Sequence, residues 1–119
     1  MDEQKQHHIM STVVALNRYI RDHEISDFRI KGLDGEMLYL VGSFDLSYYY
    51  DVEIFIAGVV HLNLPCNFWV DLSELQPFSI TFPPENNAVF NFTDCGVCQR
   101  GEIVFEEDIS FSTEHISYG

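Results

Sequence analysis

The period of the apolar residues changes early in the chain, and this change constrains the fold more than any other feature of the sequence. Four apolar residues first recur at spacings of four, three and four positions: Ile9, Val13, Leu16 and Ile20. Such spacing places them on one stripe of a helix. Later in the chain, apolar and polar residues alternate, which is typical of strands that bury one face. The pattern predicts a helix over about residues 8–22 and a β-rich region over about residues 27–115.

Turn and bulge signals divide the β-rich region into about seven strands. Asp34-Gly35 separates two apolar runs and predicts a hairpin with a type I′ turn, because both central residues of that turn need positive φ. Residues 48–57 alternate and predict one long strand, after which Gly58 predicts a bulge or bend. Other strands are expected at 68–70, 78–82, 88–92 and 102–113, the last with a bulge near Glu107.

These elements predict an α+β fold in a single domain, residues 1–119. The N-terminal helix is expected to pack on a mostly antiparallel, curved sheet, because consecutive strands are joined by short turns. A chain of 119 residues suits one domain, and a composition that is 46% hydrophobic can bury a core. Whether the sheet forms a half-barrel or a sandwich stays open at this point.

Acidic residues dominate the chain after residue 31. The 19 acidic and 6 basic residues give a formal net charge of -13, and Arg100 is the only Lys or Arg after Lys31. This charge disfavours binding to a nucleic-acid backbone or to an anionic membrane, because like charges repel. The longest apolar run, residues 54–60, is far shorter than the about 20 residues that a membrane-spanning helix needs. We therefore expect neither nucleic acid nor membrane as a partner.

The N-terminal segment and the cysteine content predict a cytoplasmic protein. The opening residues, MDEQKQHHIM, hold no apolar stretch of signal-peptide length. The 3 cysteines are an odd number and a poor basis for a disulfide framework, so reduced thiols are expected.

The Cys95/Cys98 pair forms a C-x-x-C motif and is the strongest candidate for chemistry in the sequence. Such a pair holds either part of a zinc site or a redox disulfide. Zinc would need further ligands, and the sequence offers Cys66 and His61. A thioredoxin-like disulfide needs a helix N-terminus, whereas this motif lies between predicted strands. A structural role without any cofactor is therefore the main expectation, and a zinc or redox module is the alternative.

The sequence contains no recognised catalytic pattern. A G-x-S-x-G nucleophile elbow, a phosphate-binding G-x-x-x-x-G-K-[ST] loop and a G-x-G-x-x-G fingerprint are all absent from it. A calcium loop of the form D-x-[DN]-x-[DN]-G is absent as well. The sequence therefore predicts a protein that is not an enzyme and has no catalytic residues.

Acidic residues with aromatic neighbours form the candidate partner-binding surface. In a strand, Asp51 and Glu53 share one face with Tyr49, and Glu106 and Asp108 share a face as well. A negative field speeds the capture of a basic protein, and aromatic side chains supply binding energy. The predicted interface residues are Tyr49, Asp51, Glu53, Glu102, Glu106 and Asp108, with Tyr48, Tyr50 and Trp69 as further aromatic anchors.

Residues 27–65 combine a hairpin signal with a bent strand. The segments that carry this pattern are Asp34-Gly35, Leu38-Tyr39-Leu40, the strand 50–59 with its Gly58-Val59 bend, and Leu62-Asn63-Leu64-Pro65. Together with the preceding helix, the pattern resembles small acidic immunity proteins of bacterial polymorphic-toxin systems of the contact-dependent inhibition type. The resemblance implies inhibition of a cognate toxin by direct binding, and it transfers no catalytic or binding residue to this chain.

The sequence thus predicts a binding protein that neutralises a basic partner protein, with an immunity protein that inhibits a toxin as the leading hypothesis. A DNA-mimic inhibitor is an alternative beside the zinc or redox module, because carboxylates at alternate strand positions lie about 7 Å apart and could imitate phosphates. Self-association into a homodimer through a strand edge rich in Tyr and Phe is a further hypothesis.

Overall fold

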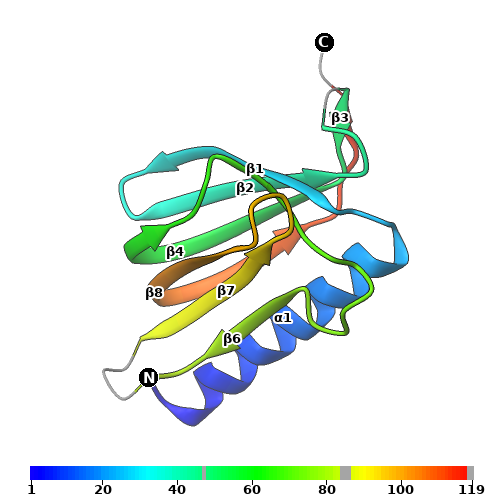
Figure 1. Cartoon of the computed structure of the whole chain (residues 1–119). Coiled ribbons are helices and arrows are strands. Elements are labelled where there is room, and N and C mark those ends of the chain that lie inside the picture. Colours follow the sequence, from blue (N-terminus) through cyan, green and yellow to red (C-terminus); the bar gives the residue numbers. More distant parts are fainter. Residues whose placement is uncertain (47, 84–86, 118–119) are drawn as a thin grey trace.

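The computed structural model describes residues 1–46, 48–83 and 87–117, and in this part of the chain one helix packs on a curled sheet (Figure 1). The helix, α1, spans Glu3–Asp22. A separate two-stranded ribbon pairs β3 (Tyr49–Tyr50) with β9 (Ile116–Ser117). The ribbon stands at one end of the main sheet (Figure 1).

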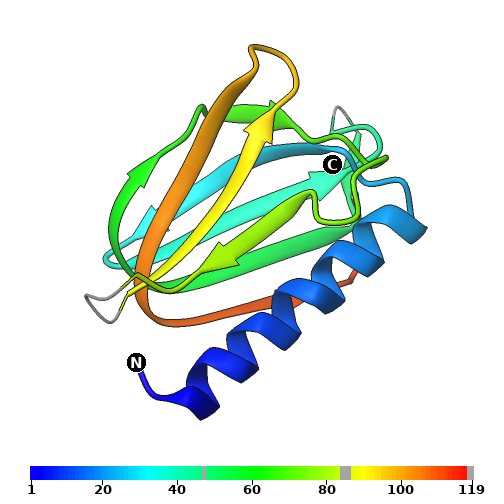
Figure 2. The same ribbon diagram turned by 60° about the horizontal axis from the view of Figure 1, so that its bottom comes forward.

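The main sheet contains seven described strands in the spatial order β5-β1-β2-β4-β8-β7-β6, and each of these pairs is antiparallel. The bounds are Asp27–Asp34 for β1, Met37–Ser43 for β2, Val52–Asn63 for β4, Asn67–Trp69 for β5, Phe78–Thr81 for β6, Ala88–Asp94 for β7 and Gln99–Ser112 for β8. The predicted α+β fold with a curved antiparallel sheet is confirmed. Of the two architectures left open, the sheet is a half-barrel (Figures 1 and 2).

Helix α1 begins at Glu3 because Asp2 caps it. The Asp2 side chain accepts a hydrogen bond from the Lys5 N–H at 2.8 Å. The predicted start near residue 8 is therefore wrong, since the apolar stripe marks only the buried part of the helix. All four residues of that stripe are buried in the core. Within the described residues, no helix is both long enough and apolar enough to cross a membrane.

The sheet curls until strands from its two ends meet across the core (Figure 2). The ring of Phe68 on β5 stacks on the ring of Phe92 on β7, with centroids 4.0 Å apart. Helix α1 lies against β6 and β8 on the remaining side. Its Asn17 side chain exchanges two hydrogen bonds with the Phe78 backbone, at 2.8 and 3.0 Å, and so satisfies part of the free edge of β6.

The predicted hairpin forms between β1 and β2, but its turn is centred one residue later than expected. Asp34 and Met37 are the last paired residues, so Gly35 and Glu36 occupy the two central positions. Gly35 has a φ of 60°, whereas Glu36 is not among the described residues with positive φ. Glycine with positive φ at the first central position is the pattern of a type II′ turn. The predicted type I′ turn on Asp34-Gly35 is therefore wrong.

The two predicted irregularities of the long strands meet in the ladder between β4 and β8. The register shifts between Ala57 and Val59, where Gly58 lies against Glu107. Gly58 has a φ of 74°, and a Cβ there would lie 2.9 Å from the Glu107 backbone nitrogen. Only glycine meets both requirements. The bulge predicted at Gly58 and the one near Glu107 are confirmed as one feature, which increases the local twist of both strands.

The single strand predicted over residues 48–57 is divided in the structure. Tyr49 and Tyr50 belong to β3, which pairs with β9 instead of continuing into β4. The chain bends at Asp51, whose N–H donates to the Gly42 carbonyl at 2.9 Å. The prediction of one strand is wrong because the pairing of β3 with β9 is long-range and leaves no trace in the local alternation.

Candidate partner-binding surface

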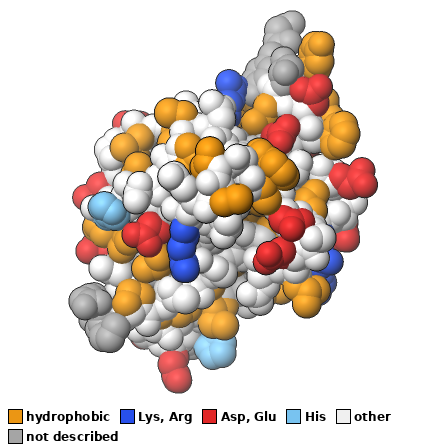
Figure 3. Space-filling model, viewed as in Figure 1, with side chains coloured by type: hydrophobic (Ala, Val, Ile, Leu, Met, Phe, Trp, Pro, Cys, Tyr) orange, Lys and Arg blue, Asp and Glu red, His pale blue; other side chains and the backbone are white. Residues whose placement is uncertain are grey.

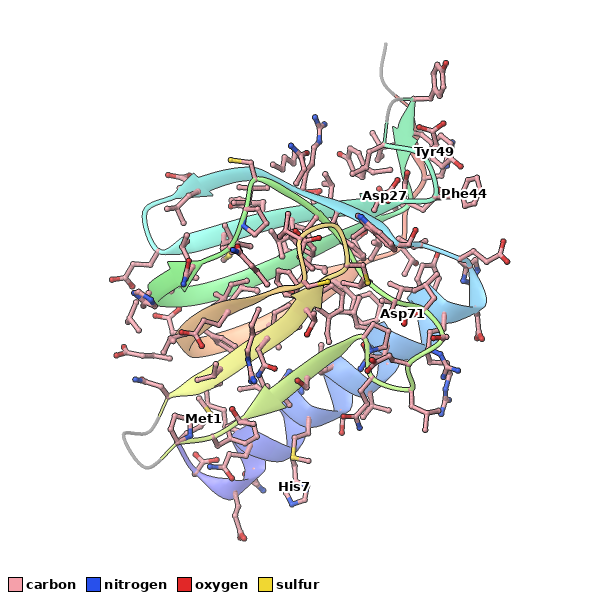
Figure 4. The ribbon with its side chains drawn as sticks, in the orientation of Figure 1. Met1, His7, Asp27, Phe44, Tyr49 and Asp71 are labelled. Carbon is pink, nitrogen blue, oxygen red and sulfur yellow. The ribbon has the colours of Figure 1, made fainter. Side chains whose placement is uncertain are left out.

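Three predicted interface residues lie where the β3–β9 ribbon joins the main sheet, and Figure 4 labels Tyr49 there. His115 Nδ1 is hydrogen-bonded to Asp51 Oδ1, and the His115 ring centroid lies 4.9 Å from that of Tyr49. Glu53 is paired with Lys31, whose Nζ lies 3.0 Å from Glu53 Oε1, and only 14% of the Glu53 side chain is exposed. The hydrogen bond to Glu53 is the main cause that raises the pKa of Lys31. Each of these carboxylates thus has a basic or imidazole neighbour from the same chain.

The three predicted residues on β8 are spread along the strand. Glu102 lies near its start, whereas Glu106 and Asp108 are exposed beside the start of α1. His8 Nε2 lies 3.3 Å from Asp108 Oδ1, and Lys5 Nζ donates to the Glu106 carbonyl at 2.9 Å. The structure therefore brings Glu106 and Asp108 together but leaves Glu102 apart from them.

The predicted Cys95/Cys98 motif forms the loop between β7 and β8. The Cys98 N–H donates to the Asp94 carbonyl at 2.8 Å and closes the loop. Cys66, Cys95 and Cys98 are all free thiols. Burial, followed by the negative charges of Asp71 and Asp94, raises the pKa of the Cys95 thiol and disfavours the thiolate that redox chemistry needs. These features support a structural role for the loop.

The alternative zinc ligands are not assembled. Cys66 is exposed on the loop between β4 and β5, whereas His61 is exposed on β4 itself. In the described part of the chain, no three His, Cys, Asp or Glu side chains are grouped so that they could hold a metal ion. The structure therefore does not form the zinc site that the sequence left open for Cys66, Cys95, Cys98 and His61.

Exposed apolar side chains gather at one end of the half-barrel, where β5 meets the loop after β2 and the loop between β7 and β8. We call this region the Trp69 patch, and it consists of the exposed Phe44, Trp69 and Val97, the half-buried Leu46 and the carboxylates of Asp27 and Asp45. Figure 3 shows hydrophobic and acidic side chains side by side on this face. The exposed fractions of Trp69, Val97 and Phe44 are 47%, 59% and 62%. Such clusters are typical of protein–protein contact sites.

A shallow cavity of about 450 Å³ lies within the Trp69 patch. Asp27 on β1 is the direct cross-strand partner of Trp69 on β5, so both side chains project from the same face of the sheet. Asp27 also pairs with Ser43, the last residue of β2, after which the chain leads to Phe44 and Asp45. Figure 4 shows Asp27 and Phe44 at this same end of the sheet. One wall of the cavity thus combines an indole with neighbouring carboxylates.

Asp94 fixes the loop that forms another wall of the cavity. Its Oδ1 accepts hydrogen bonds from the Gly96 N–H at 3.0 Å and from the Trp69 N–H at 3.4 Å. The Cys95 N–H in turn donates to the Trp69 carbonyl at 2.9 Å. A Cβ on Gly96 would lie 3.1 Å from Trp69 Nε1, so the loop backbone closely approaches the indole. These contacts attach the β7–β8 loop to β5 and hold the shape of the cavity.

The lining of this cavity is acidic. It includes Asp27, Asp45 and Asp94, and none of the described residues that line it is Lys, Arg or His. Burial raises the pKa of Asp27, and the negative charge of Asp45 raises it further. Negative charge on Asp27 is therefore costly in the folded chain, and a bound cation would reduce that cost.

Sequence reasoning identified Trp69 as an aromatic anchor but missed Asp27 and Asp45 beside it. Asp27 and Trp69 meet only through the ladder between β1 and β5, and such a long-range pairing has no local signal. The apolar residues Phe44 and Leu46, on either side of Asp45 between two predicted strands, are the one local feature that indicates an unusual surface.

No protein-family model matches the chain, and no curated protein or solved structure matches it. The resemblance of residues 27–65 to immunity proteins therefore stays a prediction, and the functional argument depends on the Trp69 patch itself.

Proposed function

We propose that this chain is a non-enzymatic binding protein that captures a basic partner protein and neutralises it. In this proposal the partner is a toxin, and the chain is the immunity protein that inhibits it. The observation that carries the proposal is the Trp69 patch, where exposed aromatic and aliphatic side chains lie beside Asp27 and Asp45. The resemblance of residues 27–65 to immunity proteins supports the same function.

Apolar contact supplies the affinity in this proposal. Loss of a central tryptophan typically costs an interface about 2 kcal/mol or more, because the ring fills a desolvated pocket of the partner. Trp69, Phe44 and Val97 expose large apolar surfaces that a partner would bury. The neighbouring carboxylates favour a partner with a basic contact surface, because charge complementarity suppresses other partners.

The net charge of the chain adds attraction at longer range. A charge of -13 raises the rate at which a basic protein meets the chain. Salt screens this effect over a Debye length of about 8 Å at physiological ionic strength. Glu106 and Asp108 lie beside the start of α1, away from the Trp69 patch (Figure 1), and act in this proposal by steering the partner.

Affinity capture from the organism that makes the chain tests the proposal. The tagged wild-type chain is compared with Trp69→Ala, and Val14→Ala is the matched control because Val14 is a similarly exposed apolar residue on α1. We expect the wild type and Val14→Ala to capture one basic protein in stoichiometric amount, and Trp69→Ala to lose it. The purified partner should be toxic when expressed alone and harmless when the chain is co-expressed.

Two outcomes contradict the proposal. One is that no basic protein is captured at either low or physiological salt. The other is that a basic protein is captured but keeps its full activity when the chain is bound to it.

A further inference from the structure

We propose that the cavity beside Trp69 is a pocket for one arginine side chain presented by the basic partner. The identity of that partner rests on the proposed function, whereas the affinity of the pocket for an arginine side chain does not. Three features of the described residues carry the inference: a half-exposed indole, carboxylates on the same wall and an apolar rim.

Trp69 and Asp27 offer complementary contacts to a planar cation. A guanidinium stacks on an aromatic face and donates paired N–H groups to a carboxylate. Because Asp27 and Trp69 are direct cross-strand neighbours, their Cβ atoms lie about 5 Å apart. One guanidinium can therefore contact both side chains at once.

The carboxylates place negative charge where the cation would lie. Asp27 and Asp45 are close enough for the charge of Asp45 to raise the pKa of Asp27, in addition to the larger effect of burial. None of the described lining residues is basic. A guanidinium would reduce the repulsion between the two carboxylates, whereas an anionic side chain would increase it.

The apolar rim favours arginine over lysine and over a metal ion. Leu46 and Val97 line the cavity and can cover the methylene groups of an arginine side chain. A lysine ammonium is compact and strongly hydrated, so it gains less from stacking on an indole. A metal ion is disfavoured because the described residues contain no group of three suitable ligands.

The pocket has its shape before any partner binds. Asp94 accepts hydrogen bonds from the backbone of both Gly96 and Trp69, so the β7–β8 loop and β5 are joined. A pre-formed site loses less conformational entropy on binding than one that must be ordered. The arginine pocket therefore does not need a rearrangement of the chain.

Titration with short peptides tests the pocket without knowledge of the partner. The probes are acetyl-Gly-Arg-Gly-amide, its lysine analogue and its citrulline analogue, which keeps the shape of arginine without the charge. Trp69 is the only tryptophan among the 119 residues, so its fluorescence and its indole N–H resonance report on the pocket directly. At physiological salt we expect saturable, millimolar binding of the arginine peptide, binding of the lysine peptide that is weaker by about fivefold or more, and no binding of the citrulline peptide.

Two variants of equal charge separate the pocket from general attraction. Asp27→Asn removes a carboxylate from the pocket, and Glu36→Gln removes one from the exposed β1–β2 turn, at the other end of β1 from Asp27. We expect Asp27→Asn to weaken binding of the arginine peptide about tenfold, as the loss of a charge-assisted hydrogen bond does. Glu36→Gln should change it less than about twofold, because salt screens a distant exposed charge. Thermal unfolding checks that both variants fold, and the comparison of the three peptides on the wild type stands without them.

Several results would contradict the proposal that this cavity binds an arginine side chain. Equal binding of the arginine and lysine peptides, equal losses from the two variants, or no saturable change at Trp69 would each do so. If Asp27→Asn captures the protein partner as well as the wild type does, the pocket fails while the proposed function stands. If the arginine peptide saturates Trp69 but no basic protein is captured, the pocket stands while the proposed function fails.

Discussion

Carboxylates lie in two regions of the molecule and have different neighbours in each. One region is the outer face of β4 and β8, which is the face turned away from the core, and the other is the Trp69 patch. On the outer face, Glu53 is paired with Lys31 and Asp108 lies beside His8. In the Trp69 patch, Asp27 lies beside Asp45 and an exposed indole, and the described residues that line the cavity include no base. Glu53 therefore contributes a contact within the fold and Asp108 stays exposed to act at longer range, whereas the carboxylates of the Trp69 patch are suited to direct contact with a ligand.

The difference shows that net charge by itself does not locate an interface. A salt bridge within the chain cancels most of the local field of its carboxylate, so little attraction remains for a partner. A carboxylate beside an exposed aromatic ring offers a partner both charge and apolar area. An interface is therefore expected where exposed acidic and aromatic side chains lie together.

The substitution Trp69→Ala should have the largest effect, a loss of about 2–4 kcal/mol in affinity for the captured partner. It removes the anchor of the Trp69 patch but keeps the β5 backbone N–H that bonds to Asp94. Isothermal titration calorimetry measures the loss, and Val14→Ala is the control. A loss below about 0.5 kcal/mol would place the interface elsewhere, and the outer face of β8 would be the next region to test.

Asp94→Ala should lower the free energy of unfolding by about 1–3 kcal/mol, because it removes the acceptor of the Gly96 and Trp69 N–H groups. Urea unfolding measures the change. Asp71→Ala is the control, since its carboxylate also accepts a backbone N–H, from Ser73 at 2.9 Å, but is exposed. If both variants unfold at the same urea concentration, Asp94 does not hold the β7–β8 loop as inferred.

The Lys31–Glu53 pair on the outer face should contribute about 0.5–1 kcal/mol to stability, because Lys31 is half-exposed and the pair is partly screened. A double-mutant cycle with Lys31→Met and Glu53→Gln measures the coupling. The pKa of Lys31 is raised above 10.5 in the folded chain, so the contribution is complete at neutral pH and is lost as pH rises through the raised value. A coupling that does not fall in strong alkali would contradict this assignment.

The smallest expected effect is a gain in the free energy of unfolding, caused by Asp27→Asn. Because burial and Asp45 raise the pKa of Asp27 above 3.8, the unfolded chain loses this proton at lower pH than the folded chain does. Stability therefore falls as pH rises from 3.8 through the raised pKa. Asp27→Asn removes that loss and should stabilise the chain by about 0.5 kcal/mol at neutral pH, after allowance for solvent screening.

The gain from Asp27→Asn should disappear as the pH is lowered toward 3.8, and thermal unfolding across this pH range measures it. A variant that is less stable than the wild type at neutral pH would show that a cation or donor already satisfies Asp27 within the chain. Such a result would make the Trp69 patch resemble the outer face and would weaken the contrast between them.

Local patterns predicted the elements well where one segment decides its own structure. The stripe on α1 and the bulge at Gly58 follow from the spacing of apolar residues and from the conformational freedom of glycine. The predictions were wrong where a single hydrogen bond or a one-residue shift in strand register decides where a helix or a turn begins. Examples are the cap at Asp2 and the turn at Gly35–Glu36.

By itself, the sequence determined the α+β class, the large negative charge and the positions of the aromatic residues. Only the tertiary structure decided which carboxylate meets which neighbour. The ladder between β1 and β5 brings Asp27 to Trp69, and the order of β1, β2 and β4 brings Lys31 to Glu53. The physical reason is that alternation along a strand sets the face of each residue. Which strands become neighbours depends on burial of the whole core, and no local window of sequence contains that information.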